Sequence, residues 1–189
     1  SKIYFYVNEA ELPSKSQLKK VLEILAQHPL FEVVFAFYNG SPERVKELEG
    51  QLEELIASEQ DLHLVQSPSQ SEGLGENQII DEESVQDAPD SRFVVKNFSN
   101  ENDIIQELEK TRLIVDLSEE PNLYTQIAGI SAGIPQVNRV QTEYVDHLKN
   151  GYVLSKGDKE LEKAITHFLL GTKPWSTQSK KFKNTPVNA

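Results

Sequence analysis

The 189-residue sequence contains no cysteine and no methionine. The lack of cysteine excludes disulfides, thiolate metal sites and a cysteine nucleophile. The four histidines are widely spaced and form no metal-ligand motif, so we expect no metal site. No apolar run approaches the roughly 20 residues that a membrane-spanning helix needs, and the first residues lack a signal-peptide pattern. Because the initiator methionine is also absent, we expect a fragment of a longer protein or an excised piece of one.

Charge is unevenly distributed along the chain, whose formal net charge is −11. An acidic body repels nucleic acid, because binding to phosphates requires Lys and Arg. All acidic residues lie at or before Glu162, whereas residues 172–189 carry lysine and no acid. We therefore predict an acidic body without nucleic-acid partners, followed by a basic tail at 172–189. The tail could contact an acidic partner or an anionic surface, and a solvated terminus is an equally good interpretation.

Strands and helices are predicted to alternate along the chain. Mainly apolar or β-branched runs of strand length occur at 3–7, 33–37, 62–65, 93–95, 113–117 and 152–154, and a further strand is expected at 136–138. Apolar spacing and capping residues predict helices that begin near residues 14, 42, 100, 124, 142 and 158. Continuous apolar strands indicate burial on both faces. The pattern therefore predicts an α/β fold, a Rossmann-like parallel sheet with helices on both faces, over residues 1–171.

One segment inside this predicted domain breaks the alternation. Residues 67–91 contain seven acidic residues and no Lys or Arg, with scattered Gly, Pro and Ser. Such a composition buries too little apolar area to offset the entropy lost on ordering. We predict an acidic, flexible insertion at 67–91.

The loops after the predicted strands at 3–7 and 113–117 are the candidate ligand sites, because open parallel sheets bind ligands beyond the carboxyl ends of their strands. The first loop contains Asn8, Glu9 and Glu11 but no glycine and no positive charge, so its two carboxylates would repel a nucleotide diphosphate. It can equally be an ordinary strand-to-helix loop. The other loop contains Ser118, Glu119 and Glu120 within reach of a nucleotide-sugar. A solvated helix N-terminus, favoured by the helix dipole, is the alternative interpretation.

A family resemblance is carried by four stretches of the second half. They are the strand and turn at 91–99, the strand at 113–117, the AGIPQV element at 132–137 and the KNGYVL element at 149–154. Over residues 91–171 these stretches resemble the C-terminal half of the GT-B glycosyltransferase fold. The resemblance implies the same fold here.

The resemblance also implies which catalytic residues to expect. Retaining GT-B enzymes carry two glutamates separated by seven residues in the donor loop. The first matches Glu120, but the second, which holds the ribose of the donor nucleotide, matches Ala128. A methyl group cannot accept ribose hydroxyls, so we expect a degenerate donor site, no cofactor and no enzymatic activity. The residues of this degenerate site are Asn8, Glu9, Ser118, Glu119, Glu120, Asn122, Tyr124 and Ala128.

Residues 124–138, with the sequence YTQIAGISAGIPQVN, further resemble the family of the first accessory secretory protein of the accessory Sec system. That resemblance implies a cytoplasmic, non-catalytic component of an export complex. Peripheral association with the inner face of the cell membrane is a further expectation. The implied partners are the other accessory secretory proteins, the accessory SecA motor ATPase and the serine-rich-repeat glycoprotein adhesins that they export, with carbohydrate as a further candidate ligand. Two alternatives remain: an active glycosyltransferase domain that uses a nucleotide-sugar, and a non-catalytic subunit that stabilises a glycosyltransferase.

Overall fold

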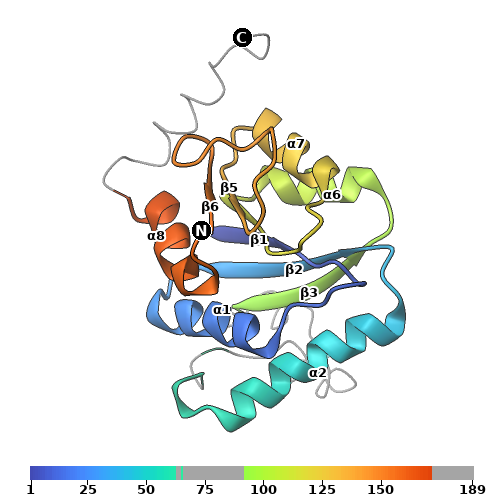
Figure 1. Cartoon of the computed structure of the whole chain (residues 1–189). Helices are drawn as coiled ribbons and strands as arrows, with labels where there is room; N and C mark the ends of the chain where they lie inside the picture. Colours follow the sequence, from blue (N-terminus) through green and yellow to red (C-terminus); the bar gives the residue numbers. More distant parts are fainter. Residues whose placement is uncertain (63–64, 66–91, 172–189) are drawn as a thin grey trace.

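The computed structural model describes residues 1–62, 65 and 92–171, which form one parallel sheet between two helical layers (Figure 1). The six strands are β1 (Lys2–Tyr6), β2 (Glu32–Tyr38), β3 (Phe93–Phe98), β4 (Leu113–Asp116), β5 (Gln136–Asn138) and β6 (Gly151–Val153). Every pairing between neighbours is parallel. The predicted Rossmann-like sheet is therefore confirmed, whereas the predicted insertion at 67–91 and tail at 172–189 lie outside the described residues.

The order of the strands is β3-β2-β1-β4-β5-β6. This is the order of doubly wound nucleotide-binding sheets, in which the chain reverses its direction of winding between β1 and β4. The loops that follow β1 and β4 separate there and leave a crevice at the carboxyl edge of the sheet. This crevice contains the two loops that the sequence identifies as candidate sites.

Side-chain caps explain where several helices begin. The helices are α1 (Lys15–Gln27), α2 (Pro42–Ser58), α6 (Glu101–Glu109), α7 (Leu123–Ser131) and α8 (Leu161–Leu169), with 3₁₀ turns η1 (Gln60–Leu62) and η2 (Asp158–Glu160). Ser14 and Gln17 form a reciprocal capping box at the start of α1. Asn100 and Asn122 accept backbone N–H groups at the starts of α6 and α7. These caps occupy otherwise unpaired donors of the first turn.

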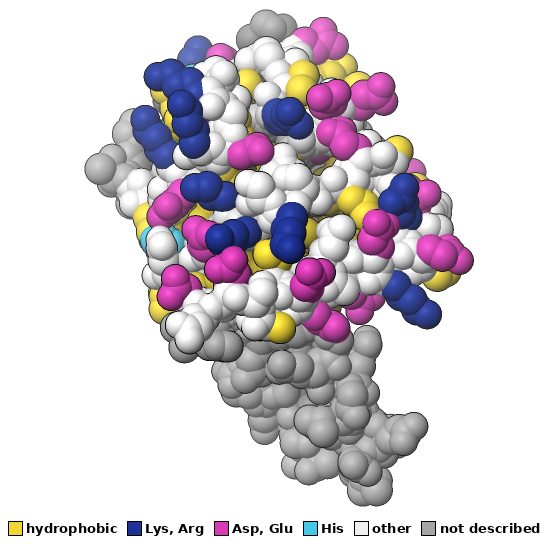
Figure 2. All heavy atoms as spheres, turned by 60° about the horizontal axis from the view of Figure 1, so that its bottom comes forward, with side chains coloured by type: hydrophobic (Ala, Val, Ile, Leu, Met, Phe, Trp, Pro, Cys, Tyr) yellow, Lys and Arg dark blue, Asp and Glu magenta, His cyan; other side chains and the backbone are white. Residues whose placement is uncertain are grey.

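The two faces of the sheet have unequal cores. The larger apolar cluster lies between the sheet and α1, α2 and α8, and the smaller one lies under α6 and α7 on the opposite face. Helices therefore cover both faces, as predicted. On the face shown in Figure 2, Lys and Arg side chains are intermingled with Asp and Glu over most of the surface. Among the described helices, none has the length and apolar character to cross a membrane.

Two predicted elements are wrong. The helix expected at 142–149 is a series of turns, because the Asn150 side chain accepts the N–H of Asp146 at 2.7 Å and donates to the carbonyl of Tyr144 at 3.0 Å. These bonds close the chain into a compact loop in which Leu148 has a left-handed φ of 67°. The strand expected at 62–65 is also wrong for the described residues, since Leu62 ends the 3₁₀ turn η1.

Candidate functional site: the crevice between β1 and β4

A buried carboxylate organises the loop that follows β4. Asp116, only 4% exposed, accepts the backbone N–H groups of Ser118 at 3.0 Å and Asn122 at 2.8 Å, and also the Ser118 hydroxyl. Burial raises the pKa of Asp116 above its ordinary value, although these hydrogen bonds oppose the shift. The Asp116 carboxylate thus holds the loop 117–122 folded back over the end of its own strand. The sequence did not predict this role, because Asp116 falls within the expected strand at 113–117.

A carboxylate side chain of the protein itself lies in the crevice. The carboxylate of Glu11, from the loop after β1, accepts the backbone N–H of Glu119 at 3.0 Å. Arg139, which follows β5, approaches Glu11 and Glu119 at 3.9 Å each. In nucleotide-binding sheets, backbone N–H groups and a positive charge at this place serve the ligand phosphates. Here these groups are engaged by the Glu11 and Glu119 carboxylates.

The remaining space in the crevice is small. A cavity of about 20 Å³ lies between the two loops and is lined in part by Asn8, Glu11 and Ser118. A volume of this size holds about one water molecule. This cavity is therefore too small to hold a nucleotide-sugar.

The predicted residues of the first loop make local contacts. The side chain of Asn8 accepts the N–H of Ala10 at 3.0 Å and closes a tight turn. The Glu9 carboxylate accepts the N–H of Ser41 at 2.8 Å, at the start of α2. Since β2 and β4 lie on opposite sides of β1, Glu9 faces away from the crevice. The structure therefore separates Glu9 from the other predicted site residues and brings Glu11 into its place.

The predicted residues of the second loop lie at the edge of the crevice. Glu119 contacts Arg139 as described, and the backbone carbonyl of Glu120 accepts the Ser118 hydroxyl at 3.0 Å. Asn122 accepts the N–H of Thr125 at 2.8 Å and donates to the Tyr6 hydroxyl at 3.4 Å. Of these residues, Asn122 stabilises the start of α7 through its side chain.

Helix α7 has its polar and apolar sides reversed. Thr125 and Gln126 are 3% and 2% exposed, whereas Leu123 and Ile127 are 47% and 43% exposed. At Gly129 an added Cβ would come within 2.3 Å of the Ile114 side chain. The helix therefore approaches the sheet closely at this position, where a residue larger than glycine does not fit without a shift of its neighbours.

Two predicted site residues lie on this helix. Tyr124 is 38% exposed, and burial together with the nearby Glu101 and Tyr38 raises its pKa. Ala128 is half-buried and packs against the smaller core. The position that matches the ribose-binding glutamate therefore makes an apolar contact with the protein itself.

The chain is similar over nearly all of its length to a known protein family. Residues 1–181 match the family model of an accessory Sec system protein, the first of that system's numbered accessory secretory proteins. A curated relative of the same description from Streptococcus gordonii is 43% identical over 176 residues, which cover 93% of this chain and 32% of the relative. The chain thus spans about a third of the length of that relative.

Solved structures show the same fold. The crystal structure of accessory secretory proteins 1, 2 and 3 of Streptococcus pneumoniae matches with a TM-score of 0.73 and 35% identity, over 96% of this chain and 30% of that chain. The catalytic domain of a cholesterol-α-glucosyltransferase from Helicobacter pylori matches with a TM-score of 0.56 and 13% identity, over 100% of this chain and 99% of that chain. The second likeness shows the fold of a GT-B glycosyltransferase domain and nothing of its activity.

Proposed function

The chain belongs to the family of the first accessory secretory protein of the accessory Sec system, and from this membership we propose that it is a non-catalytic binding component of the export complex. In this role it assembles in the cytoplasm with the other accessory secretory proteins and the accessory SecA motor ATPase. The complex recognises serine-rich-repeat glycoprotein adhesins and hands them over for secretion. The chain corresponds to the C-terminal half of a GT-B fold.

The occupation of the crevice by Glu11 is the observation that carries the non-catalytic part of this proposal. A nucleotide diphosphate would have to displace the Glu11 carboxylate from the N–H of Glu119 and from Arg139. The displaced carboxylates of Glu11 and Glu119 would then remain beside the phosphates. Like charges at such distances oppose binding. The methyl group of Ala128 packs against the apolar core and supplies no acceptor for ribose hydroxyls.

The outward apolar face of α7 supports the binding part of the proposal. We define the α7 face as Leu123, Tyr124 and Ile127, together with Tyr38 at the end of β2, which lies near enough to Tyr124 to raise its pKa. Neighbouring apolar side chains left in water favour burial against another protein. Glu101 lies beside this face, so a partner with an apolar centre and a basic group opposite Glu101 would complement it. We assign the α7 face to contact with the other accessory secretory proteins, which accompany the pneumococcal relative in its crystal structure.

Titration calorimetry tests the non-catalytic role. We expect no heat of binding when UDP-glucose or UDP-N-acetylglucosamine is added to the full-length family protein. The variant Glu11→Gln retains nearly the same side-chain volume and should also bind no donor, because Ala128 and Glu119 remain. Micromolar binding accompanied by sugar transfer to a serine-rich acceptor would overturn the proposal.

Co-purification tests the α7 face. In the full-length protein, Ile127→Glu should abolish co-purification with the other accessory secretory proteins, since it places a charge in the centre of the apolar surface. Leu30→Glu is the matched control, because Leu30 is 81% exposed and lies between α1 and β2. Equal co-purification of both variants would contradict the assignment. If Ile127→Glu instead lowered the melting temperature of the full-length protein and left assembly intact, the face would belong to a contact inside the family's longer chain.

A further inference from the structure

The chain contains two asparagine–glycine pairs, which the fold holds in different ways. Asn39-Gly40 lies between β2 and α2, and Asn150-Gly151 lies at the start of β6. Asparagine loses its side-chain ammonia more readily before glycine than before other residues, because glycine has no side chain to shield its backbone nitrogen. Whether either pair reacts depends on how firmly the fold holds that nitrogen and the asparagine carboxamide.

Local packing favours both residues of the pair at 39–40. Asn39 has a left-handed φ of 51°, which asparagine adopts more easily than most residues. At Gly40 an added Cβ would lie 2.8 Å from the ring of Phe37, which is 1% exposed. Within the described part of the chain, the exposed Asn39 carboxamide has no hydrogen-bond partner. The geometry of this turn therefore places a reactive pair at the surface.

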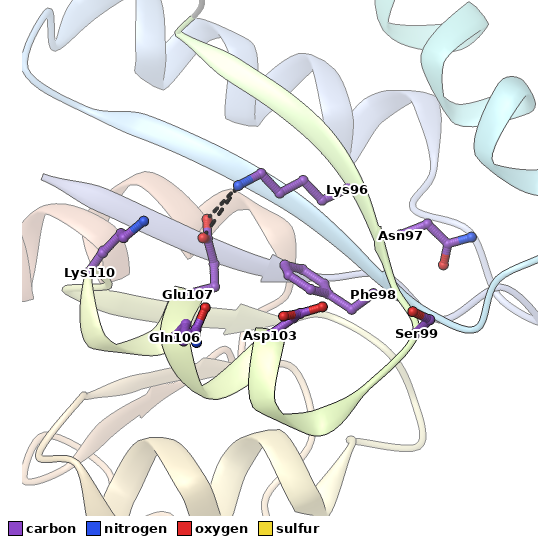
Figure 3. Close-up of a pocket in the computed structure, with 8 residues that line it drawn as sticks. All are labelled: Lys96, Asn97, Phe98, Ser99, Asp103, Gln106, Glu107 and Lys110. Atoms are coloured by element: carbon purple, nitrogen blue, oxygen red, sulfur yellow. Dashed lines mark hydrogen bonds and ion pairs between the residues drawn. The ribbon is translucent and has the colours of Figure 1, made fainter.

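The side chain of Asn97, from β3, holds both backbone polar groups of Gly40. Its Oδ1 atom accepts the N–H of Gly40 at 2.9 Å, and its Nδ2 atom donates to the Gly40 carbonyl at 2.8 Å. Figure 3 shows the Asn97 side chain extending from β3 away from Lys96 and Glu107. We call these two hydrogen bonds the Asn97 clamp. The Gly40 nitrogen can react only after the clamp opens, because its proton is donated to Asn97.

The reaction begins at the Gly40 nitrogen. This nitrogen bonds to the side-chain carbonyl carbon of Asn39, and the carbon–nitrogen bond of the carboxamide breaks. The departing amino group takes the Gly40 proton and leaves as ammonia. Water then opens the succinimide ring at either carbonyl and yields aspartate or isoaspartate. We propose that Asn39 is a site of spontaneous deamidation and that the Asn97 clamp sets its rate.

Deamidation at this site changes the turn between β2 and α2. Either product adds a negative charge directly after Tyr38, and isoaspartate also lengthens the backbone by a methylene group. The Glu9 carboxylate already occupies the N–H of Ser41 in this turn, at 2.8 Å. The inference does not depend on the proposed function.

The pair at 150–151 provides a comparison within the same molecule. The Asn150 carboxamide is engaged at both ends, since it accepts the N–H of Asp146 at 2.7 Å and donates to the carbonyl of Tyr144 at 3.0 Å. An added Cβ at Gly151 would lie 2.6 Å from the carbonyl oxygen of Gln136, so the backbone there is closely packed. We therefore expect Asn150 to resist deamidation.

Incubation of the 189-residue chain at mildly alkaline pH, followed by peptide mapping in a mass spectrometer, tests the proposal. We expect deamidation at Asn39 and none at Asn150. The Asn39 rate should be lower in the folded chain than in the same chain unfolded in urea. Protein isoaspartyl methyltransferase measures the isoaspartate fraction, which identifies the succinimide route.

Three variants separate the effect of the clamp from a general loss of stability. Asn97→Ala should raise the rate at Asn39 about three- to tenfold, the effect of losing neutral hydrogen bonds at an exposed site. Asn97→Asp should react at nearly the wild-type rate, because a carboxylate oxygen still accepts the Gly40 N–H. Asn100→Ala is the matched control, since it also loses two side-chain hydrogen bonds, both to Asp103 and neither to the turn. Circular dichroism establishes that the variants remain folded.

Four results would overturn the inference. Asn39 could stay intact in both the wild type and Asn97→Ala, or Asn150 could react as fast as Asn39. Asn100→Ala could accelerate the reaction as much as Asn97→Ala, which would attribute it to general opening of the fold. Equal acceleration by Asn97→Asp and Asn97→Ala would show that acceptance of the Gly40 N–H gives no protection.

Discussion

The close approach of α7 to the sheet predicts that two helical glycines respond in opposite ways to the same substitution. Replacing a glycine in a helix interior with alanine normally stabilises a protein by about 0.5–1 kcal/mol, because glycine has more conformational freedom in the unfolded chain. At Gly50 in α2, an added Cβ would have no heavy atom within 4 Å and would therefore meet no neighbour. We therefore expect Gly50→Ala to raise the free energy of unfolding by about that amount.

Gly129 in α7 is the contrasting case. An added Cβ would lie 2.3 Å from the terminal carbon of Ile114 and 2.4 Å from the amide nitrogen of Gln136. Both residues are 1% exposed, and the Gln136 amide donates to the carbonyl of Ile134 at 3.1 Å. Moving these buried groups costs about 1–3 kcal/mol as overpacking. After the gain in helix propensity is subtracted, Gly129→Ala should lower the free energy of unfolding by about 0.5–2 kcal/mol.

Urea denaturation followed by circular dichroism measures both changes. The two midpoints should move in opposite directions, whereas the slope of the unfolding free energy against urea should stay constant. A thermal scan should show the same signs, at about 2–4 °C for each 1 kcal/mol in a chain of this size. If Gly129→Ala stabilised the protein as much as Gly50→Ala, the reasoning that α7 packs closely on the sheet at Gly129 would be refuted.

Three further substitutions test the loops around the crevice and the turn at 142–149. Asp116→Asn should cost about 1–3 kcal/mol, because one carboxamide oxygen cannot accept all the donors of the loop. Burial raises the pKa of Asp116, so in the wild-type protein this group adds stability as the pH falls toward about 4. Urea titrations should therefore show that the difference in unfolding free energy between wild type and Asp116→Asn grows as the pH falls. A difference that stays constant with pH would contradict this. Arg139→Gln should change the free energy of unfolding by less than about 1 kcal/mol, because its ion pairs are solvent-exposed, and a larger loss in urea would show that they hold the loops together. Leu148→Asn should raise the free energy of unfolding by up to about 1 kcal/mol, and with it the melting temperature, because asparagine tolerates the left-handed φ better than leucine. A lower melting temperature would mean that the exposed Leu148 side chain contributes packing.

Most of the helices and strands could be predicted because several local signals agree at each of them. The Ser14 cap and the Ser41-Pro42 pair are visible as sequence, and the structure places both at helix starts. The helix expected at 142–149 failed because the local hydrogen bonds of the Asn150 side chain compete with helical ones. A pattern of apolar spacing contains no information about such side-chain competition.

Part of the candidate site could be predicted from the sequence and part could not. The resemblance to glycosyltransferases was enough to predict that Ala128 stands where a ribose-binding glutamate is expected. It could not decide which of the two glutamates in the loop after β1 lies in the crevice, because Glu9 and Glu11 are only two positions apart. The direction of each side chain depends on what lies on either side of β1, which is α2 for Glu9 and the loop after β4 for Glu11.

The sequence by itself determined the alternation of strands and helices and the parallel α/β class. Each of these follows from residue type and spacing along a short stretch of chain. Only the tertiary structure decided that Glu11 meets the backbone of Glu119, 108 positions away, and that α7 turns its apolar side chains outward. Both depend on which strands are neighbours and how closely their loops and helices approach, and local periodicity does not encode either distance.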